Sequence, residues 1–205
     1  SRGNGDDRQE EDVAKLSRPP LVLASTSPRR RDILRSMGIS FEVVSPEGDG
    51  PEAEGDPAER VLAHARWKAE KVRSSIGDYA VLAADTLVFL DGHALGKPID
   101  SASARGMLES LFDRGHEVWT GIFLVNPEGE TAETACRASV HFHRPETGDL
   151  DLYLEGREWA DKAGGYGIQG WAGRWTTVVE GEMETVVGLP SKAVRELMAR
   201  LALAP

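Results

Sequence analysis

The sequence predicts an α/β protein, and three observations support this class. Short apolar runs, typical of buried strands, alternate with segments whose apolar residues recur at helical spacing. Two longer strand-like stretches, 116–126 and 131–143, are separated by a turn at 127–129, which favours an antiparallel pair. A closing amphipathic segment carries Val194, Leu197, Met198 and Leu201 in helical phase. Strands that alternate with helices along one chain favour the α/β class.

The first strand, turn and helix are predicted between residues 21 and 38. The apolar run 21–24 ends at Ser25-Thr-Ser-Pro28, and beyond it Ile33, Leu34 and Met37 recur at helical spacing until Gly38. Pro28 suits the first helical turn, where its missing N–H costs nothing, and Ser27 is a natural N-cap. A second strand follows at 41–44, and residues 45–57 form an acidic loop.

The rest of the chain continues this alternation. A long helix starts near Pro57, because its apolar residues form one stripe: Val61, Ala65, Ala69, Val72 and Ile76. Residues 81–90 are apolar except for Asp85 and Thr86, which predicts a buried strand that turns at 91–92. After it we expect helices at 101–112 and 150–154, a glycine-rich segment at 164–173, and strands at 175–179 and 185–187.

Composition and charge restrict the partners and the compartment. The 205 residues carry 24 Lys plus Arg against 34 Asp plus Glu, a net charge of −10. This balance argues against wholesale binding to nucleic acid or to anionic membranes, because such binding depends on clustered cations. No apolar run approaches the roughly 18 to 20 residues that span a bilayer.

Cysteine usage and the start of the chain add two expectations. Cys136 is the only cysteine, so the chain forms neither an internal disulfide nor a cysteine-based zinc site, and with no secretory leader we expect a cytoplasmic location. Residues 1–20 are mostly polar and predict a disordered acidic tail, which leaves 21–205 as a single domain.

The turn Ser25-Thr-Ser-Pro-Arg-Arg-Arg31 is the first candidate for chemistry. A phosphate at the start of the helix would meet unpaired backbone N–H groups, the hydroxyls of Ser25 and Ser27, and the guanidinium of Arg29 or Arg30. The spacing of a Walker P-loop is absent. The alternative is an ordinary helix cap followed by a solvated basic turn.

Asp85 is the second candidate, together with two lysines. A carboxylate inside so apolar a run must be paired, bound to a metal or protonated. Its alternative role is a structural ion pair with an arginine. Two lysines are further candidates, Lys68 on the long helix and Lys97 in Gly96-Lys-Pro98. Taken alone, each would be interpreted as a solvated surface charge. With the two arginines they supply the cations that a polyphosphate ester and a divalent ion require.

The segment Gly165-Tyr-Gly-Ile-Gln-Gly170 matches the dinucleotide pattern G-x-G-x-x-G, but neither an apolar strand before it nor sufficient chain after it supports that fold. Its glycines would let the backbone approach a ligand, and Gln169 offers a donor and an acceptor to a base edge. His141 and His143 share a strand face and, without a third ligand nearby, are expected to be exposed. Trp171 and Trp175 are candidates for stacking on a ligand.

Five segments, in this order, resemble the Maf family of nucleotide pyrophosphatases, also called septum-formation inhibitor proteins: Leu23-Ala-Ser-Thr-Ser-Pro-Arg-Arg30, Ala84-Asp-Thr86, Gly96-Lys-Pro98, Asp161-Lys-Ala-Gly-Gly-Tyr-Gly-Ile-Gln-Gly170 and Val186-Val-Gly-Leu-Pro190. The resemblance runs from about Leu21 to Leu201. It implies an inosine-triphosphatase-like fold, with a mixed sheet, flanking helices and a cleft between two lobes, in a protein that is often a homodimer. It also implies hydrolysis of nucleoside triphosphates to monophosphate and pyrophosphate with a divalent metal, Mg²⁺ or Mn²⁺.

The resemblance also implies roles for individual residues. Asp85 corresponds to the general base for the attacking water and lies near the metal, and Asp49 is a second candidate metal ligand in a loop where Gly48 and Gly50 depart from the family pattern. The phosphate-binding set corresponds to Ser25, Arg30, Lys68 and Lys97. Positions that separate subfamilies are occupied by Arg29, Thr86 and Gln169, as in the branch that acts on dTTP and UTP. Trp171-Ala-Gly-Arg-Trp175 is bulkier than the residues usual in the family.

Two other functions stay open from the sequence. The same phosphate-binding turn would serve a non-hydrolysing nucleotide-binding regulator of cell division, with the acidic tail as a docking segment. It would also serve an inosine-triphosphatase-like enzyme that removes purine nucleotides. The expected partners are a nucleoside triphosphate and a second copy of the chain, with no nucleic acid and no membrane, and the regulator would in addition act through partner proteins.

Overall fold

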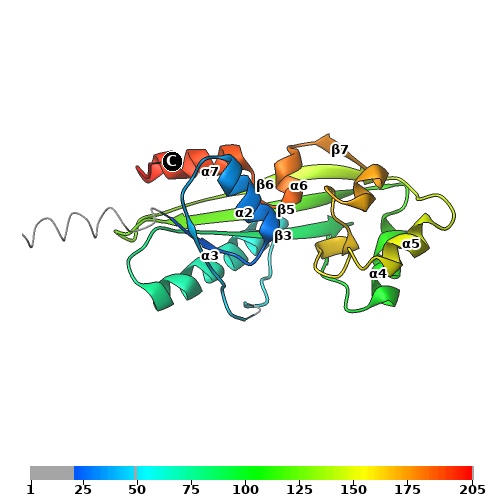
Figure 1. Ribbon diagram of the computed structural model, residues 1–205, viewed down its shortest axis with the longest axis horizontal. Helices are drawn as coiled ribbons and strands as arrows, with labels where there is room; N and C mark the ends of the chain where they lie inside the picture. The colour runs from blue at the N-terminus through cyan, green and yellow to red at the C-terminus, as the bar shows by residue number, and fades with distance from the viewer. Residues whose placement is uncertain (1–20, 49, 205) are drawn as a thin grey trace, which may run out of the picture.

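A computed structural model describes residues 21–48 and 50–204 (Figure 1). Its strands are β1 (Val22–Ala24), β2 (Glu42–Val44), β3 (Val81–Leu90), β4 (His93–Leu95), β5 (Arg114–Val125), β6 (Thr131–Phe142) and β7 (Thr176–Glu180). These seven strands form one sheet in the order β2-β1-β3-β5-β6-β7, with β4 paired to β3 outside that path. β1 runs parallel to β2 and β3, and the other pairs are antiparallel. The α/β class and the mixed sheet are therefore confirmed.

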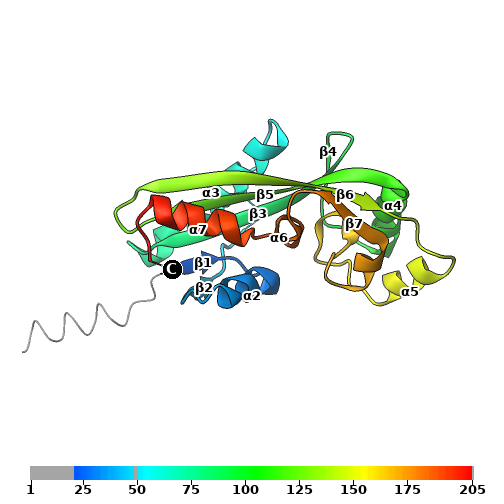
Figure 2. The same ribbon diagram turned by 90° about the horizontal axis from the view of Figure 1, so that it is seen from above.

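Helices cover both faces and one end of this sheet. They are α2 (Pro28–Ser36), α3 (Pro57–Ile76), α4 (Ser101–Leu111), α5 (Asp149–Glu155), α6 (Met183–Val187) and α7 (Ser191–Arg200), with short 3₁₀ turns η1 (Ala163–Gly165) and η2 (Trp171–Trp175). Figure 2 shows α3 on one face and α2 with α7 on the other, while α4 and α5 gather at the far end. Each group buries its own apolar cluster against the sheet.

The edge of β3 is open over a short stretch in the middle of the strand. β5 pairs with one side of β3 from Val81 to Phe89. On the other side, β1 pairs only as far as Ala83, and β4 pairs only from Val88 onward. Among the described residues no strand pairs with 84–87 on that side. Polar groups of β3 are consequently free to face a ligand there, and this stretch contains Asp85 and Thr86.

Helix α3 packs unusually close to the sheet at Gly121. A Cβ added at this position of β5 would lie 2.6 Å from the carbonyl carbon and oxygen of Val61 on α3. Glycine is thus required for the helix to approach the strand. Gly121 is also the register partner of Asp85. The close packing therefore brings α3 alongside the open stretch of β3.

The predicted cap at Ser27 and most predicted elements are confirmed, and α3 has a capping box that was not predicted. The Ser27 side chain accepts a hydrogen bond from the backbone N–H of Arg30, Pro28 starts α2, and α3 begins with a capping box between Asp56 and Glu59. The stripe on α3 is buried as expected from Val61 to Val72, and Ile76 at its end is half-buried. The predicted tail 1–20 lies outside the described residues. Within the described part of the chain, no helix is both long and apolar enough to cross a membrane.

One predicted strand was wrong. Residues 185–187 form part of helix α6, although the β-branched Thr185 favoured a strand. β7 already occupies the place beside β6, and Gly188, at φ +117°, ends the helix in the left-handed region. The helix lets the backbone carbonyl of Thr185 accept a hydrogen bond from Thr120 on β5, at 2.8 Å.

Candidate active site

A cavity of about 640 Å³ opens along the free stretch of β3. This volume is typical of sites for small molecules of nucleotide size. Its lining includes every predicted site residue that the structure describes, namely Ser25, Arg29, Arg30, Lys68, Asp85, Thr86, Lys97 and Gln169. Asp49 lies outside the described residues. The sequence candidates thus come from the β1–α2 turn, α3, β3, the segment after β4 and the glycine-rich segment, and they meet in one place.

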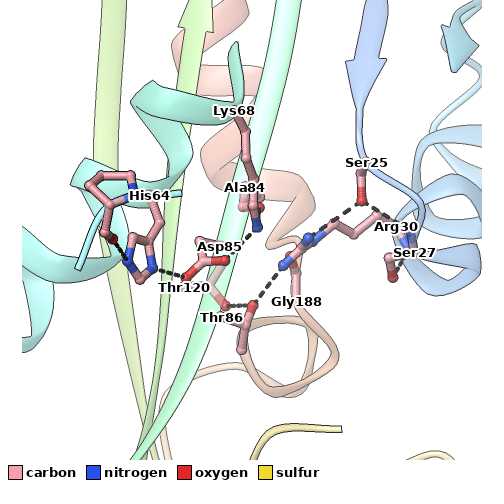
Figure 3. Close-up of polar contacts among 11 residues, drawn as sticks. Ser25, Ser27, Arg30, His64, Lys68, Ala84, Asp85, Thr86, Thr120 and Gly188 are labelled. Atoms are coloured by element: carbon pink, nitrogen blue, oxygen red, sulfur yellow. Dashed lines mark hydrogen bonds and ion pairs between the residues drawn. The ribbon is translucent and has the colours of Figure 1, made fainter. Parts of the chain in front are cut away.

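Arg30 is held in this cavity by three protein groups. Its Nε donates to the carbonyl of Gly188 at 2.8 Å, its Nη2 to the hydroxyl of Thr86 at 3.0 Å, and its Nη1 to the hydroxyl of Ser25 at 3.4 Å (Figure 3). Burial lowers the pKa of the guanidinium, although Asp85 opposes this. A guanidinium carries more N–H donors than these three bonds use, so Arg30 is fixed in place with donors left for an anion.

Thr86 belongs to a chain of hydroxyls that runs across the sheet. Thr120 donates to the carbonyl of Thr185 at 2.8 Å, so its oxygen is free to accept from Thr86, which lies 2.8 Å away. The Thr86 oxygen in turn accepts from Arg30. The chain of donors fixes Arg30 against β3 and β5, and Thr86 acts here as a support for Arg30.

Asp85 is held at both carboxylate oxygens by residues of α3. Lys68 donates to Oδ1, and Nδ1 of His64 lies 3.0 Å from Oδ2. The Lys68 ammonium also lies 3.4 Å from the carbonyl of Ala84, on the open edge of β3. Figure 3 shows both side chains reaching Asp85 from the same helix. They are one helical turn apart, so the i, i+4 geometry of α3 places both at one carboxylate.

The electrostatics of this cluster keep Asp85 ionised. Burial alone would raise the pKa of Asp85, but the hydrogen bond from His64 and the charge of Lys68 together hold it below its usual value. Burial lowers the pKa of Lys68, and the attraction of Asp85 opposes that change. The apolar strand therefore contains a paired carboxylate, as its sequence required.

His64 also contacts the acidic loop. Its Nε2 lies 3.0 Å from the carbonyl oxygen of Pro51. Both ring nitrogens thus face oxygens that only accept, which favours a ring protonated at both nitrogens. The hydrogen bond to Asp85 raises the pKa of His64 accordingly, against the effect of burial. The sequence analysis did not single out His64, although its i, i+4 spacing from Lys68 was a usable signal.

The lining of the cavity also includes Arg29, Lys97, Gln169 and Asp161. Arg29 lies 3.9 Å from the carboxylate of Asp161, so the two walls of the cavity meet there through a long ion pair. Lys97 and Gln169 are exposed, and the positive charge of Lys97 contributes to lowering the pKa of Lys68. The sequence analysis quoted Asp161 only as part of a motif and assigned it no role. The cavity thus combines four cations, Arg29, Arg30, Lys68 and Lys97, with the amide of Gln169.

The expected stacking role of the two late tryptophans finds no support. Trp175 is 5 % exposed and packs edge-to-face on Tyr153, with 5.4 Å between the ring centroids. The ring centroid of Trp171 lies 6.0 Å from that of Trp175. Neither ring lines the cavity among the residues that the structure describes. Trp67 on α3 lines it instead, and its ring lies against Gly48 and Gly50, where an added Cβ would be 3.4 and 3.1 Å away.

The glycines near Gln169 serve the chain's own packing. A Cβ on Gly170 would lie 1.8 Å from the carboxylate of Glu158, and one on Gly173 would lie 2.1 Å from the carbonyl of Ile168. Glu158 also accepts the backbone N–H of Trp171 at 3.1 Å. These contacts bend the segment so that Gln169 reaches the cavity. As expected, His143 is exposed; His141 is half-buried.

A divalent ion fits this site through Asp85. Across residues 21–48 and 50–204, no group of three or more His, Cys, Asp and Glu side chains is arranged to hold a metal. Mg²⁺ commonly uses only one or two carboxylates and completes its shell with water and substrate phosphates. The ionised carboxylate of Asp85 beside a phosphate-binding turn meets that requirement.

Comparisons with known proteins identify the family of this chain. The model of the Maf-like protein family matches residues 20–201. The dTTP/UTP pyrophosphatase of Moorella thermoacetica is 41 % identical over 181 residues, which cover 87 % of this chain and 93 % of the relative. That of Pyrococcus abyssi is 40 % identical over 178 residues, covering 87 % and 94 %. Among solved structures, the Ham1 protein of Staphylococcus aureus is 16 % identical with a TM-score of 0.48, covering 89 % of this chain and 97 % of that one. By its family match and these relatives, the chain belongs to the Maf family.

Proposed function

We propose that this protein hydrolyses nucleoside triphosphates, dTTP and UTP before others, to nucleoside monophosphate and pyrophosphate. The observation that carries the proposal is the largely buried carboxylate of Asp85, bonded by Lys68, in a cavity of nucleotide size that Arg30 also lines. Relatives at about 40 % identity that are named dTTP/UTP pyrophosphatase support it.

The chemistry follows from the charges in the cavity. Water attacks the α-phosphorus, a new P–O bond forms, and the bond to the bridging oxygen breaks and releases pyrophosphate. The leaving group gains negative charge, which the guanidinium of Arg30 and the ammonium groups of Lys68 and Lys97 neutralise. Ser25 and the first N–H groups of α2 hold a phosphate at the helix N-terminus. Asp85 accepts a hydrogen bond from the water and takes its proton.

The contacts of Asp85 suit an orienting base. A carboxylate with a lowered pKa is a weak base, so its contribution depends on fixed geometry more than on proton affinity. Lys68 and His64 supply that geometry by holding both oxygens. When bound, Mg²⁺ or Mn²⁺ would sit at Asp85, with Asp49 as a second candidate ligand, and would supply Lewis-acid stabilisation of phosphate charge.

The base is selected at the end of the cavity near Gln169. Thymine and uracil present a carbonyl acceptor beside an N3–H donor, and one amide can pair with both. Cytosine reverses these groups, so an amide held in one orientation would face a donor with its donor and an acceptor with its acceptor, and each group left unpaired once the bound base covers it costs about 1 to 3 kcal/mol. Purines are larger than the space this pairing requires. Arg29 and Asp161, paired with each other, line the same cavity.

A panel of nucleoside triphosphates assayed for pyrophosphate release tests the function. With Mg²⁺ or Mn²⁺ we expect kcat/KM for dTTP and UTP to exceed that for GTP, ATP and CTP at least about tenfold. A purine in first place would contradict the proposed base selection. Tight nucleotide binding with no pyrophosphate from any member of the panel would instead favour the non-hydrolysing regulator.

The proposal also covers the cellular location and the oligomeric state of the enzyme. We place the reaction in the cytoplasm and in a homodimer of residues 21–205 folded as one domain. Cell fractionation and sedimentation velocity test these two points, and a monomer at micromolar concentration with full turnover would contradict the second.

A further inference from the structure

We propose that His64 is a positioning residue that fixes the carboxylate of Asp85 by bonding its Oδ2, so that water and substrate meet a carboxylate that cannot rotate. The inference rests on the proposed function, because it concerns the same reaction. It adds a residue that neither the sequence motifs nor the phosphate-binding set contains.

The first support is the geometry of the ring. Nδ1 lies 3.0 Å from Oδ2 of Asp85, and Nε2 lies 3.0 Å from the carbonyl oxygen of Pro51. A planar ring bonded at two opposite nitrogens has no free rotation left. The ring is also largely shielded, since the His64 side chain is 21 % exposed. His64 is therefore a rigid link between the loop that contains Pro51 and the carboxylate of Asp85.

The second support is that Lys68 and His64 bond different oxygens of the Asp85 carboxylate. Lys68 occupies Oδ1, and the ammonium group by itself leaves the carboxylate free to turn about its own axis. His64 removes that freedom by occupying Oδ2. The two residues lie on the same face of α3, which Gly121 allows to approach β3 and β5 closely. Holding a reacting group in one orientation is a large part of what an enzyme site contributes to rate.

A different role for His64 must be separated from this one. The ring anchors the backbone at Pro51, so removing it would also loosen the loop. The loop has a second anchor in Trp67, whose ring lies against Gly48 and Gly50. A loop anchor depends on the bond from Nε2 to Pro51, whereas a positioning residue depends on the bond from Nδ1 to Asp85. Substitutions that keep one bond and remove the other can therefore separate the two roles.

Two amide side chains imitate the two nitrogens separately. In His64→Asn the amide nitrogen falls near the place of Nδ1 and can donate to Asp85, while in His64→Gln it reaches the place of Nε2 and can donate to Pro51. His64→Ala removes both bonds. Each variant is assayed with dTTP and saturating metal at one fixed pH, and its fold is checked by circular dichroism and thermal midpoint. Affinity for an α,β-imido analogue of dTTP is measured without turnover.

We expect His64→Ala and His64→Gln to lose about tenfold to a hundredfold in kcat, with KM and analogue affinity within about threefold of wild type. His64→Asn should stay within about threefold of the wild-type kcat. Full activity of His64→Ala would overturn the inference, as would rescue by Gln in place of Asn, or an equal loss in all three. If His64→Ala does not fold, the comparison of Asn with Gln still decides. Absence of turnover in the wild type would refute the proposed function separately.

Discussion

Gly121 of β5 is the position where one added methyl group should damage both stability and activity. It lies beneath α3 and opposite Asp85 in the register of β3 and β5. In Gly121→Ala the new Cβ would meet the carbonyl carbon and oxygen of Val61 at 2.6 Å and the nitrogen of Leu62 at 2.8 Å. These atoms belong to the helix backbone, so no side chain can rotate away to make room.

The size of the effect follows from that overlap. Ordinary contact begins at 3.4 Å, so α3 must retreat by about 0.8 Å. Overpacking of this kind costs about 1 to 3 kcal/mol, and each kcal/mol lowers the thermal midpoint by roughly 2 to 4 °C in a chain of this size. The same movement draws His64 and Lys68 away from Asp85. A displacement near 1 Å at a reacting group costs up to about a hundredfold in rate.

Denaturant unfolding and dTTP kinetics on one preparation measure both effects. Gly115→Ala is the matched control, because Gly115 lies on the same strand and an added Cβ there meets nothing within 4 Å. We expect the control to keep wild-type kcat/KM and stability. If Gly121→Ala is as stable and as active as Gly115→Ala, the account of how α3 is held against Asp85 is refuted.

Three further outcomes follow from individual contacts. Asp85→Asn should abolish pyrophosphate release while nucleotide affinity stays within about tenfold, because the amide keeps the shape but cannot take a proton; undiminished turnover would remove Asp85 from catalysis. Arg30→Ala should raise KM and lower kcat together, since its phosphate contact strengthens as charge moves onto the leaving group; unchanged values for both would leave the turn as a helix cap only. His116 is 4 % exposed, and burial lowers its pKa to about 4, below its unfolded value near 6.5. Between those pH values the unfolded state binds more protons, so stability falls as pH falls, by less than about 4 kcal/mol, and His116→Gln should flatten this slope in denaturant melts from pH 7 to 4. An unchanged slope would contradict neutral burial of the ring.

Local sequence signals predicted most of the fold and the residues of the site, but not the contacts that those residues make with one another. The cap at Ser27, the stripe on α3 and the apolar run of β3 are properties of short segments, so they could be read without the tertiary structure. Asp85 was identifiable because a carboxylate in an apolar strand needs a partner. The spacing of His64 and Lys68 indicated a shared helix face, but whether that face reaches Asp85 depends on how closely α3 approaches β5, which no local pattern reports.

Tertiary context also explains the two expectations that were wrong or unsupported. The run that contains Thr185 favoured a strand, yet the place beside β6 is taken by β7, and Gly188 ends a short helix instead. Trp171 and Trp175 lie next to the glycine-rich segment in sequence, but their rings turn into the cluster around Tyr153. Proximity along the chain therefore did not indicate which aromatic ring, Trp67, faces the cavity.

The most direct test of the central claim is the position of the bond that breaks. Hydrolysis of dTTP in ¹⁸O-labelled water, followed by mass spectrometry of both products, reports which phosphorus the water attacks. Attack aligned by Asp85 at the α-phosphorus predicts one ¹⁸O in the nucleoside monophosphate and none in the pyrophosphate. Label in the pyrophosphate, or release of orthophosphate as the first product, would contradict the proposed reaction at this site.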